Sequence, residues 1–195
     1  MDGMLLVVSG PAGSGKNTVC ERLMAECPTV TRAVTTTTRP PRPGEADGRD
    51  YYFTTPEEFE RGIEAGEFYE WARVHGRYYG TSRREILEKL SCGLDVILII
   101  DVQGARAWRA VAESDGRISD ALRCVFIRPE SLDVVRGRMR LRGDSDSEIE
   151  RRIETAKREL EEEKYFDRTI VSGTRDEDFE ALLKIYRGFR AERGA

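Results

Sequence analysis

The stretch from Ser9 to Thr18 constrains the fold more than any other part of the chain. It has the sequence S-G-P-A-G-S-G-K-N-T, with an apolar run before it, Met4 to Val8, and a helical pattern after it, Thr18 to Ala25. A glycine, four residues and then Gly-Lys between a buried strand and a helix is the spacing of a phosphate-binding loop. Such glycines let successive backbone N–H groups turn toward one anion, which the helix N-terminus also attracts. We therefore predict that a nucleotide phosphate binds here, with Lys16 reaching its outer phosphates.

Composition narrows the class of protein. With 195 residues the chain is long enough to bury a core, and 39% hydrophobic with 35% charged residues is typical of a globular protein. The net charge of −4 argues against bulk binding to nucleic acid or to an anionic membrane. The four cysteines lie apart from one another and from the single histidine, so no zinc site is expected. Without a signal peptide or an apolar run of transmembrane length, we expect a cytoplasmic protein.

Apolar runs alternate with helical patterns along the chain. Continuous β-branched runs at 95–100 and 122–127 are typical of central parallel strands. Residues 39–81 lie after the first helix and before these two strands. They combine aromatic strand-like runs with one helix that starts at Thr55-Pro56, which predicts a small α+β lobe. Further helices are expected at 82–90, 103–111, 131–141, 148–164 and 177–190, and a last strand at 169–172. This order predicts an α/β fold with helices on both faces of a parallel sheet and ligands outside the carboxyl ends of the strands.

Two arginine-rich segments suggest phosphoryl transfer. The segment 35–45 is T-T-T-T-R-P-P-R-P-G-E, and its two arginines suit a second phosphate, since Arg donates two parallel hydrogen bonds to phosphate oxygens. Three more arginines flank the polar loop 143–147: Arg138, Arg142 and Arg152. Such a loop can close and bring cations to a transferring phosphoryl group. Solvated helix faces and a proline-stiffened turn are the alternatives for these arginines when they are considered alone.

Together these motifs resemble the guanylate kinase family over nearly the whole chain. Beside the phosphate loop, the resemblance rests on T-T-R-x-x-R-x-G-E-x-x-G-x-x-Y from Thr37 to Tyr51, E-W-A at 70–72, Y-Y-G at 78–80, I-D-x-Q-G at 100–104, and R-x-x-x-R-G with a later arginine. It implies a P-loop three-layer α/β/α fold with a central parallel sheet, an inserted α+β GMP-binding lobe and a helical lid. The corresponding single domain has a core at 1–33, 82–141 and 165–195, a lobe at 34–81 and a lid at about 142–164.

The resemblance also implies a reaction: ATP with Mg²⁺ phosphorylates GMP, and dGMP, by direct in-line transfer that gives ADP and GDP without a phosphoenzyme. It implies that ATP is bound by Gly10, Pro11, Ala12, Gly13, Ser14, Gly15, Lys16, Asn17, Thr18 and Arg138. GMP is then bound by Arg39, Arg42, Tyr51 and Tyr79 at its phosphate and by Thr35, Glu70, Thr81 and Asp101 at its base. The catalytic cations are Lys16, Arg39, Arg142 and Arg152.

The chemistry of guanine fits this set of side chains. Guanine has donors at N1 and N2 and an acceptor at O6, so carboxylates at Glu70 and Asp101 accept while the hydroxyls of Thr35 and Thr81 donate. Adenine reverses the pattern at this edge, which would leave a buried carboxylate unpaired. The two tyrosines of the set also have a simpler interpretation as core aromatics.

The sequence departs from the family on the ATP side. Asn17 stands where the family has the serine that holds Mg²⁺, and its amide oxygen remains the predicted metal ligand, directly or through water. Ile99 replaces an acidic residue, and Ser172-Gly173 replaces Asn-Asp near where the adenine should lie. We expect activity to survive, with a weaker metal dependence or a relaxed donor preference.

Two other functions are possible for such a chain. One is a non-catalytic, peptide-binding module with a guanylate-kinase-like fold, against which the nearly intact loop with Lys16 argues. The other is a related small-molecule kinase, such as one acting on ribose bisphosphate, which would not need the guanine-recognising set. The expected partners are ATP and GMP or dGMP, with no nucleic acid and no membrane. Because members of the family are often dimers, a homodimer is one expected oligomeric state.

Overall fold

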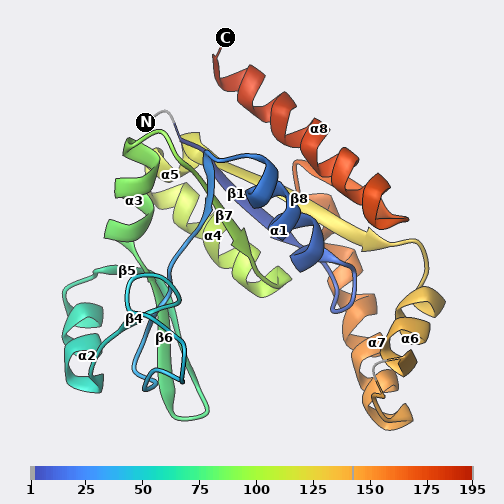
Figure 1. The fold of residues 1–195 in the computed structure, drawn as a ribbon, viewed down its shortest axis with the longest axis horizontal. Coiled ribbons are helices and arrows are strands. Elements are labelled where there is room, and N and C mark those ends of the chain that lie inside the picture. Colours follow the sequence, from blue (N-terminus) through green and yellow to red (C-terminus); the bar gives the residue numbers. More distant parts are fainter. Residues whose placement is uncertain (1–2, 142, 195) are drawn as a thin grey trace.

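A parallel sheet forms the centre of the protein (Figure 1). The computed structural model describes residues 3–141 and 143–194, without the side chain of Arg138. Over these residues the sheet has five strands in the order β2-β7-β1-β8-β9, all paired in parallel. They span Val30–Arg32, Asp95–Ile99, Leu5–Ser9, Leu122–Pro129 and Arg168–Ser172 respectively. Every residue of the middle strand β1 is buried, as expected for a parallel strand covered on both faces, so the predicted α/β sheet is confirmed.

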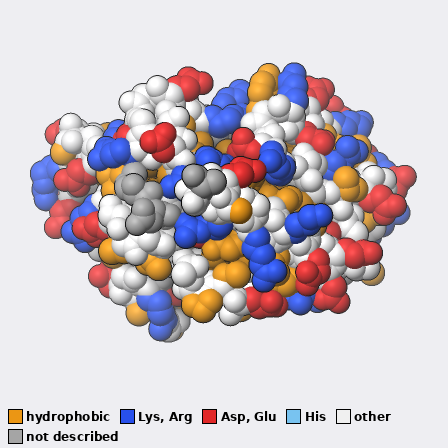
Figure 2. All heavy atoms as spheres, turned by 90° about the horizontal axis from the view of Figure 1, so that it is seen from above, with side chains coloured by type: hydrophobic (Ala, Val, Ile, Leu, Met, Phe, Trp, Pro, Cys, Tyr) orange, Lys and Arg blue, Asp and Glu red, His pale blue; other side chains and the backbone are white. Residues whose placement is uncertain are grey.

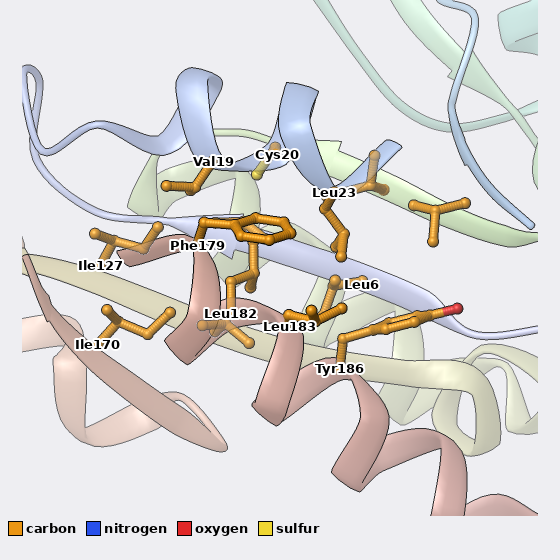
Figure 3. Packing of buried hydrophobic residues seen from close by; sticks show 14 of the residues in the cluster. Leu6, Val19, Cys20, Leu23, Ile127, Ile170, Phe179, Leu182, Leu183 and Tyr186 are labelled. Atoms are coloured by element: carbon orange, nitrogen blue, oxygen red, sulfur yellow. The ribbon is translucent and has the colours of Figure 1, made fainter. Parts of the chain in front are cut away.

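Helices cover both faces of this sheet. The helices of the described residues are α1 (Lys16–Glu26), α2 (Pro56–Glu64), α3 (Arg83–Ser91), α4 (Val102–Ser114), α5 (Gly116–Ala121), α6 (Leu132–Leu141), α7 (Asp146–Leu160) and α8 (Arg175–Gly194), with a 3₁₀ turn at Glu161–Tyr165. Helices α1 and α8 pack on one face, where Phe179 and Leu182 of α8 meet Val19 of α1 and Leu6 of β1 (Figure 3). On the other face α3 and α4 bury Ile86, Leu90 and Trp108. Two separate apolar clusters therefore hold the sheet between two helical layers.

A second, smaller sheet forms the inserted lobe. Its order is β4-β3-β6-β5, with strands at Tyr52–Phe53, Thr36–Thr37, Arg77–Ser82 and Phe68–Val74. Helix α2 begins with a capping box at Thr55 and closes one face of this sheet. From this helix the Phe59 ring stacks 4.3 Å from Phe68 and 5.1 Å from Tyr78, measured between ring centroids. Figure 1 shows the lobe as a body to one side of the central sheet, with α6 and α7 on the opposite side.

Helices α6 and α7 form a hairpin with a small core of its own. Val135 and Met139 of α6 pack against Ile149 and Ile153 of α7. The expected lid begins only at about residue 142, whereas this packing joins α6 to α7. The predicted division into core, lobe and lid stays a prediction.

The ends of the described chain meet at one buried carboxylate. Asp95 is 1% exposed at the start of β7 and accepts hydrogen bonds from the Met4 N–H and the Tyr186 hydroxyl, both at 2.7 Å. Arg190 of α8 lies 3.2 Å from the same carboxylate. The arrangement supplies this charge with the partners that burial requires.

Several element boundaries differ from those expected from the sequence. Strand β2, strand β3 and helix α5 were not expected, because segments of two to six residues carry almost no periodicity. The charged helix expected at 148–164 ends at Leu160 and tightens into the 3₁₀ turn. Helix α8 starts at Arg175 rather than at residue 177 and continues to Gly194.

Candidate active site

The phosphate loop connects β1 to α1 through a backbone that needs glycine. Gly10, Gly13 and Gly15 have φ angles of +143°, +85° and +94°, a region that favours glycine. A Cβ atom at Gly10 would lie 2.1 Å from the carbonyl oxygen of Ile127 in the neighbouring strand β8. The Ser14 N–H donates to the Pro11 carbonyl at 3.1 Å and closes the turn. The predicted strand, loop and helix therefore occur in the expected order.

The N-terminus of α1 is left open for an anion. Gly15 provides no capping side chain there, and the first turn contains no acidic residue. By contrast, Thr55, Ser82 and Ser145 cap the N-termini of α2, α3 and α7 with their hydroxyls. The buried Ser14 hydroxyl also has no hydrogen-bond partner among the described residues. Uncapped N–H groups and an unsatisfied hydroxyl at the positive end of a helix favour a bound phosphate.

Lys16 lies across this loop. Its Nζ donates to the carbonyl oxygens of Gly10 at 2.5 Å and of Pro11 at 2.9 Å. Burial lowers the pKa of Lys16, while the carboxylates of Glu159 and Asp101 act to raise it. Burial raises the pKa of Glu159, against the influence of Lys16. Sequence reasoning missed Glu159, since a glutamate in a charged helix gives no signal of its own.

On the lobe, strand register brings four of the predicted GMP-binding residues into one row. Thr36 pairs with Tyr52 of β4 and with Gly80 of β6, and Glu70 of β5 pairs with Thr81. Extending the first two pairings by one residue gives a row across the four strands: Tyr51, Thr35, Thr81 and Glu70. Residues in one row have their side chains on the same face of a sheet. A hollow of about 540 Å³ lies beside this row, bordered by Thr35, Glu45 and Tyr51 among others.

Two contacts within this face are already formed. The Thr81 hydroxyl, which is buried, donates to a carboxylate oxygen of Glu70 at 2.7 Å. The rings of Tyr51 and Tyr79 meet edge to face with centroids 6.2 Å apart. The carboxylate of Glu70 is thus held in place with acceptor capacity left over, as a group that accepts from guanine must be.

Glu45, which was not among the predicted site residues, holds both Arg39 and Arg42. Both nitrogen–oxygen contacts from Arg39 Nη2 to the Glu45 carboxylate measure 2.8 Å, and the Arg42 N–H donates to it at 2.7 Å. The hydrogen bond to Glu45 raises the pKa of Arg39, and the Arg42 N–H lowers the pKa of Glu45. Arg39 also lies over the Tyr51 ring, 5.2 Å from its centroid. The signal for Glu45 was present in the R-x-G-E motif.

Asp101 follows β7, next to β1 in the sheet, so it lies at the same edge as the phosphate loop. It is exposed, and one of its carboxylate oxygens accepts from the Gly104 N–H at 2.8 Å and caps α4. That leaves the other oxygen for a ligand. Asp101 therefore has a structural role that the sequence interpretation did not include.

The positions of the remaining predicted residues do not test their expected roles. Arg152 on α7 is paired with Glu148 at 3.0 Å and with Asp144 at 3.6 Å, so nearby carboxylates already neutralise it. Asn17 and Thr18 are exposed on the first turn of α1. Arg142 and the side chain of Arg138 lie outside the described residues. Their expected roles in the lid stay predictions.

The described residues contain neither a metal-binding cluster nor a membrane-spanning helix. No group of three or more His, Cys, Asp or Glu side chains within residues 3–141 and 143–194 could hold a metal ion. Across those same segments, every helix is too short or too polar to cross a membrane. Figure 2 shows basic and acidic side chains mixed over the face it presents.

The chain is similar to guanylate kinases along its whole length. A family model described as guanylate kinase matches residues 2–187. The guanylate kinase of Maricaulis maris is 44% identical over 192 residues, covering 98% of this chain and 84% of that protein. That of Symbiobacterium thermophilum is 46% identical over 171 residues, covering 87% and 78%.

The solved structures agree with this. The crystal structure of guanylate kinase from Anaplasma phagocytophilum superimposes with a TM-score of 0.67 at 29% identity, covering 96% of this chain and 86% of that one. The fold, the open phosphate loop and the row on the lobe thus occur in a sequence that aligns with these enzymes almost from end to end. This chain belongs to the guanylate kinase family.

Proposed function

We propose that this protein is an ATP:GMP phosphotransferase, which converts ATP and GMP, or dGMP, into ADP and GDP, or dGDP. The observation that carries this function is the match to guanylate kinases over residues 2–187, which spans both the phosphate loop and the lobe. The residues assigned below are our proposal for how this chain performs the reaction.

The donor phosphates lie on the loop between β1 and α1. The uncapped helix N-terminus, the glycine backbone and Lys16 supply positive charge there without a nearby acidic cap. When the donor binds, the Nζ of Lys16 exchanges the carbonyls of Gly10 and Pro11 for phosphate oxygens. Charge neutralisation of this kind accounts for most of the catalysis in phosphoryl transfer.

The acceptor base lies against the lobe row. Glu70 accepts from guanine N1 and N2 while it keeps its hydrogen bond from Thr81, and Thr35 donates to O6. Asp101 accepts from N2 with the carboxylate oxygen that does not cap α4. A base with a donor in place of O6 and an acceptor at N1 would cover these polar groups and leave them unpaired, so AMP should be rejected.

The acceptor phosphate lies between two arginines of the lobe, Arg39 and Arg42, and two of its tyrosines, Tyr51 and Tyr79. Glu45 fixes the Arg39 guanidinium with two contacts from one nitrogen, which leaves other N–H groups of Arg39 to donate to phosphate. Tyr51 and Tyr79 donate through their hydroxyls. The phosphate oxygen of GMP then attacks the γ-phosphorus in line, and the bond from that phosphorus to the leaving ADP oxygen breaks.

The oxygen atoms near the phosphate loop are suitable ligands for Mg²⁺, but protein ligands alone would not complete its coordination. Because no acidic cluster is found in the described segments, the ion would be held mainly by phosphate oxygens, as is usual for Mg²⁺. Asn17 on the first turn of α1, and Asp101 and Glu159 near Lys16, are the oxygen donors available directly or through water. When bound, the ion would neutralise charge on the transferring phosphoryl group.

The deciding experiment is a coupled assay of ADP release with GMP, AMP, CMP, UMP and a sugar phosphate as acceptors. We expect turnover with GMP and at least about 100-fold less with AMP, because adenine would cover the polar groups of the site and leave them unpaired. No turnover with GMP would refute the function, and binding of GMP without turnover would indicate the non-catalytic module. Preference for the sugar phosphate would indicate the related small-molecule kinase. A cytoplasmic location and a homodimer remain proposals, testable by fractionation and by light scattering.

A further inference from the structure

A second cavity touches the phosphate loop on the side away from the lobe. It measures about 310 Å³ and lies between the start of α1, the end of α6 and the turn from β9 to α8. Gly13, Gly15 and Thr18 border it from the loop and α1, and Gly173, Arg175 and Asp178 from the turn and α8. Figure 1 shows α6 and the start of α8 on the opposite side of the molecule from the lobe. The proposed function places the donor phosphates on the loop, and a base attached to them can reach this cavity because it borders Gly13 and Gly15.

The polar side chains at the turn from β9 to α8 form hydrogen bonds within the turn. Asp178 is 5% exposed, and its two carboxylate oxygens accept from the Ser172 hydroxyl at 2.8 Å and the Gly173 N–H at 2.7 Å. The N–H and hydroxyl of Thr174 both donate to Glu177, at 2.9 Å and 2.8 Å. Each oxygen of this buried carboxylate beside the cavity already accepts one hydrogen bond from its own turn. The lone pairs that remain can accept from the amino group of adenine or from the N1 and N2 donors of guanine alike, so this carboxylate does not select adenine.

Two exposed polar side chains border the cavity, Thr18 and Arg175. A hydroxyl both donates and accepts, so Thr18 can serve an amino or a carbonyl group equally. A guanidinium only donates, and Arg175 makes no hydrogen bond or ion pair with the described residues. Arginine matches the N7 and O6 acceptors of guanine, whereas adenine has a donor in place of O6. Neither side chain favours adenine.

We propose that the donor site does not select ATP by its base, and that GTP is a phosphate donor for this enzyme alongside ATP. In the GTP reaction the γ-phosphorus forms a bond to a phosphate oxygen of the acceptor. Its bond to the β,γ-bridging oxygen breaks, and the electron pair stays on that oxygen in the released GDP. A site that hydrogen-bonds its base rejects the wrong one by about 10⁴-fold or more, whereas a site without such groups discriminates by about 100-fold at most.

The test uses dGMP as acceptor, so that the products of donor and acceptor differ. The full-length protein is incubated with dGMP, Mg²⁺ and ATP or GTP labelled at the γ-phosphate, and labelled dGDP is separated by chromatography. We expect kcat/KM for the two donors to agree within about tenfold. A preference for ATP above about 100-fold would overturn the inference and leave the proposed function intact. No dGDP from ATP would refute the proposed function itself.

A pair of variants tests the assigned contact. Arg175→Ala should lower kcat/KM for GTP relative to ATP by about two- to tenfold, the change expected for losing one ordinary hydrogen bond on a solvent-exposed side chain. Arg187→Ala, an exposed arginine on the same helix away from the cavity, is the matched control and should leave the ratio unchanged. A ratio that Arg175→Ala does not alter would overturn the role of Arg175 in base recognition. If both variants altered the ratio equally, the role of Arg175 in base recognition would also be overturned.

Discussion

Glu85 holds the lobe to the core, and its removal is the sharpest test of how the GMP site is built. It lies in the first turn of α3, is 5% exposed, and accepts from three donors on different segments. One oxygen accepts from the Val34 N–H at 2.8 Å and lies 2.5 Å from Lys89 Nζ, and the other accepts from the Tyr52 hydroxyl at 3.0 Å. Val34 precedes Thr35 in the chain, and Tyr52 pairs with Thr36 in the lobe sheet.

The magnitude follows from these contacts. Glu85→Ala leaves the Val34 N–H and the Tyr52 hydroxyl without their acceptor, while Lys89 keeps its hydrogen bond to the Arg32 carbonyl at 2.8 Å. Each of these two donors left unpaired costs about 1–3 kcal/mol of unfolding free energy, while the partly exposed Lys89 adds little to the loss. Glu85→Gln keeps one carbonyl acceptor and should cost about 1–3 kcal/mol.

Urea unfolding followed by circular dichroism measures the stability, and steady-state kinetics measures the function. Because the two tethered segments carry Thr35 and Tyr51, KM for GMP should rise in both variants while KM for ATP stays nearly constant. The control is Glu88→Ala on the same helix, whose exposed pair with Arg84 at 3.6 Å should be worth less than about 1 kcal/mol. A loss below about 1 kcal/mol for Glu85→Ala, or equal rises in both KM values, would refute this reasoning.

Three further predictions concern the ATP side. Lys16→Met should lower kcat by about 10²–10³-fold. Lys16→Arg should remove the alkaline limb of the pH–rate profile. The reason is that burial lowers the pKa of Lys16, whereas an arginine does not titrate. Burial raises the pKa of Glu159 above its unfolded value, so its contribution to stability is lost as pH rises through the folded pKa. Glu159→Gln should therefore be more stable than the parent at neutral pH without nucleotide, as urea titrations across a pH series would show; equal stability would contradict this. Asn17→Ser should reduce the Mg²⁺ concentration for half-maximal activity, and identical midpoints in the two proteins would show that Asn17 does not weaken metal use.

Four of the five strands of the central sheet, all but the short β2, were predictable because their signals are local. The buried strand before the loop, the glycine spacing and the helix after it all fall within about two dozen residues, and each is decided by neighbours in the chain. The lobe was less predictable. Strands β3 and β4 have two residues each, and their register is set by pairing with β6 and not by any pattern of their own.

The same distinction applies to the candidate site. The arginines and tyrosines of the lobe could be named from motif spacing, but their common row with Thr81 and Glu70 depends on that register. The influence of the Glu159 carboxylate on Lys16 depends on where α7 lies relative to the phosphate loop, which no local sequence pattern determines. Glu45 could be seen in the motif, but its pairing with Arg39 could not be predicted, because a charged loop residue has many possible partners.

The buried carboxylate of Asp95 has a consequence for the order of events during biosynthesis. Its partner Tyr186 follows it by 91 residues, and Arg190, Phe179 and Leu182 lie on the same helix, α8, where the last two complete the apolar cluster on β1. While α8 is still inside the ribosome, the emerging sheet would expose an unpaired charge and an uncovered apolar face. A nascent chain stalled before α8 should therefore be sensitive to protease and bound by chaperones, and the native state should form only once α8 has emerged. Deletions within α8 would disturb the folding of strands that are synthesised long before it.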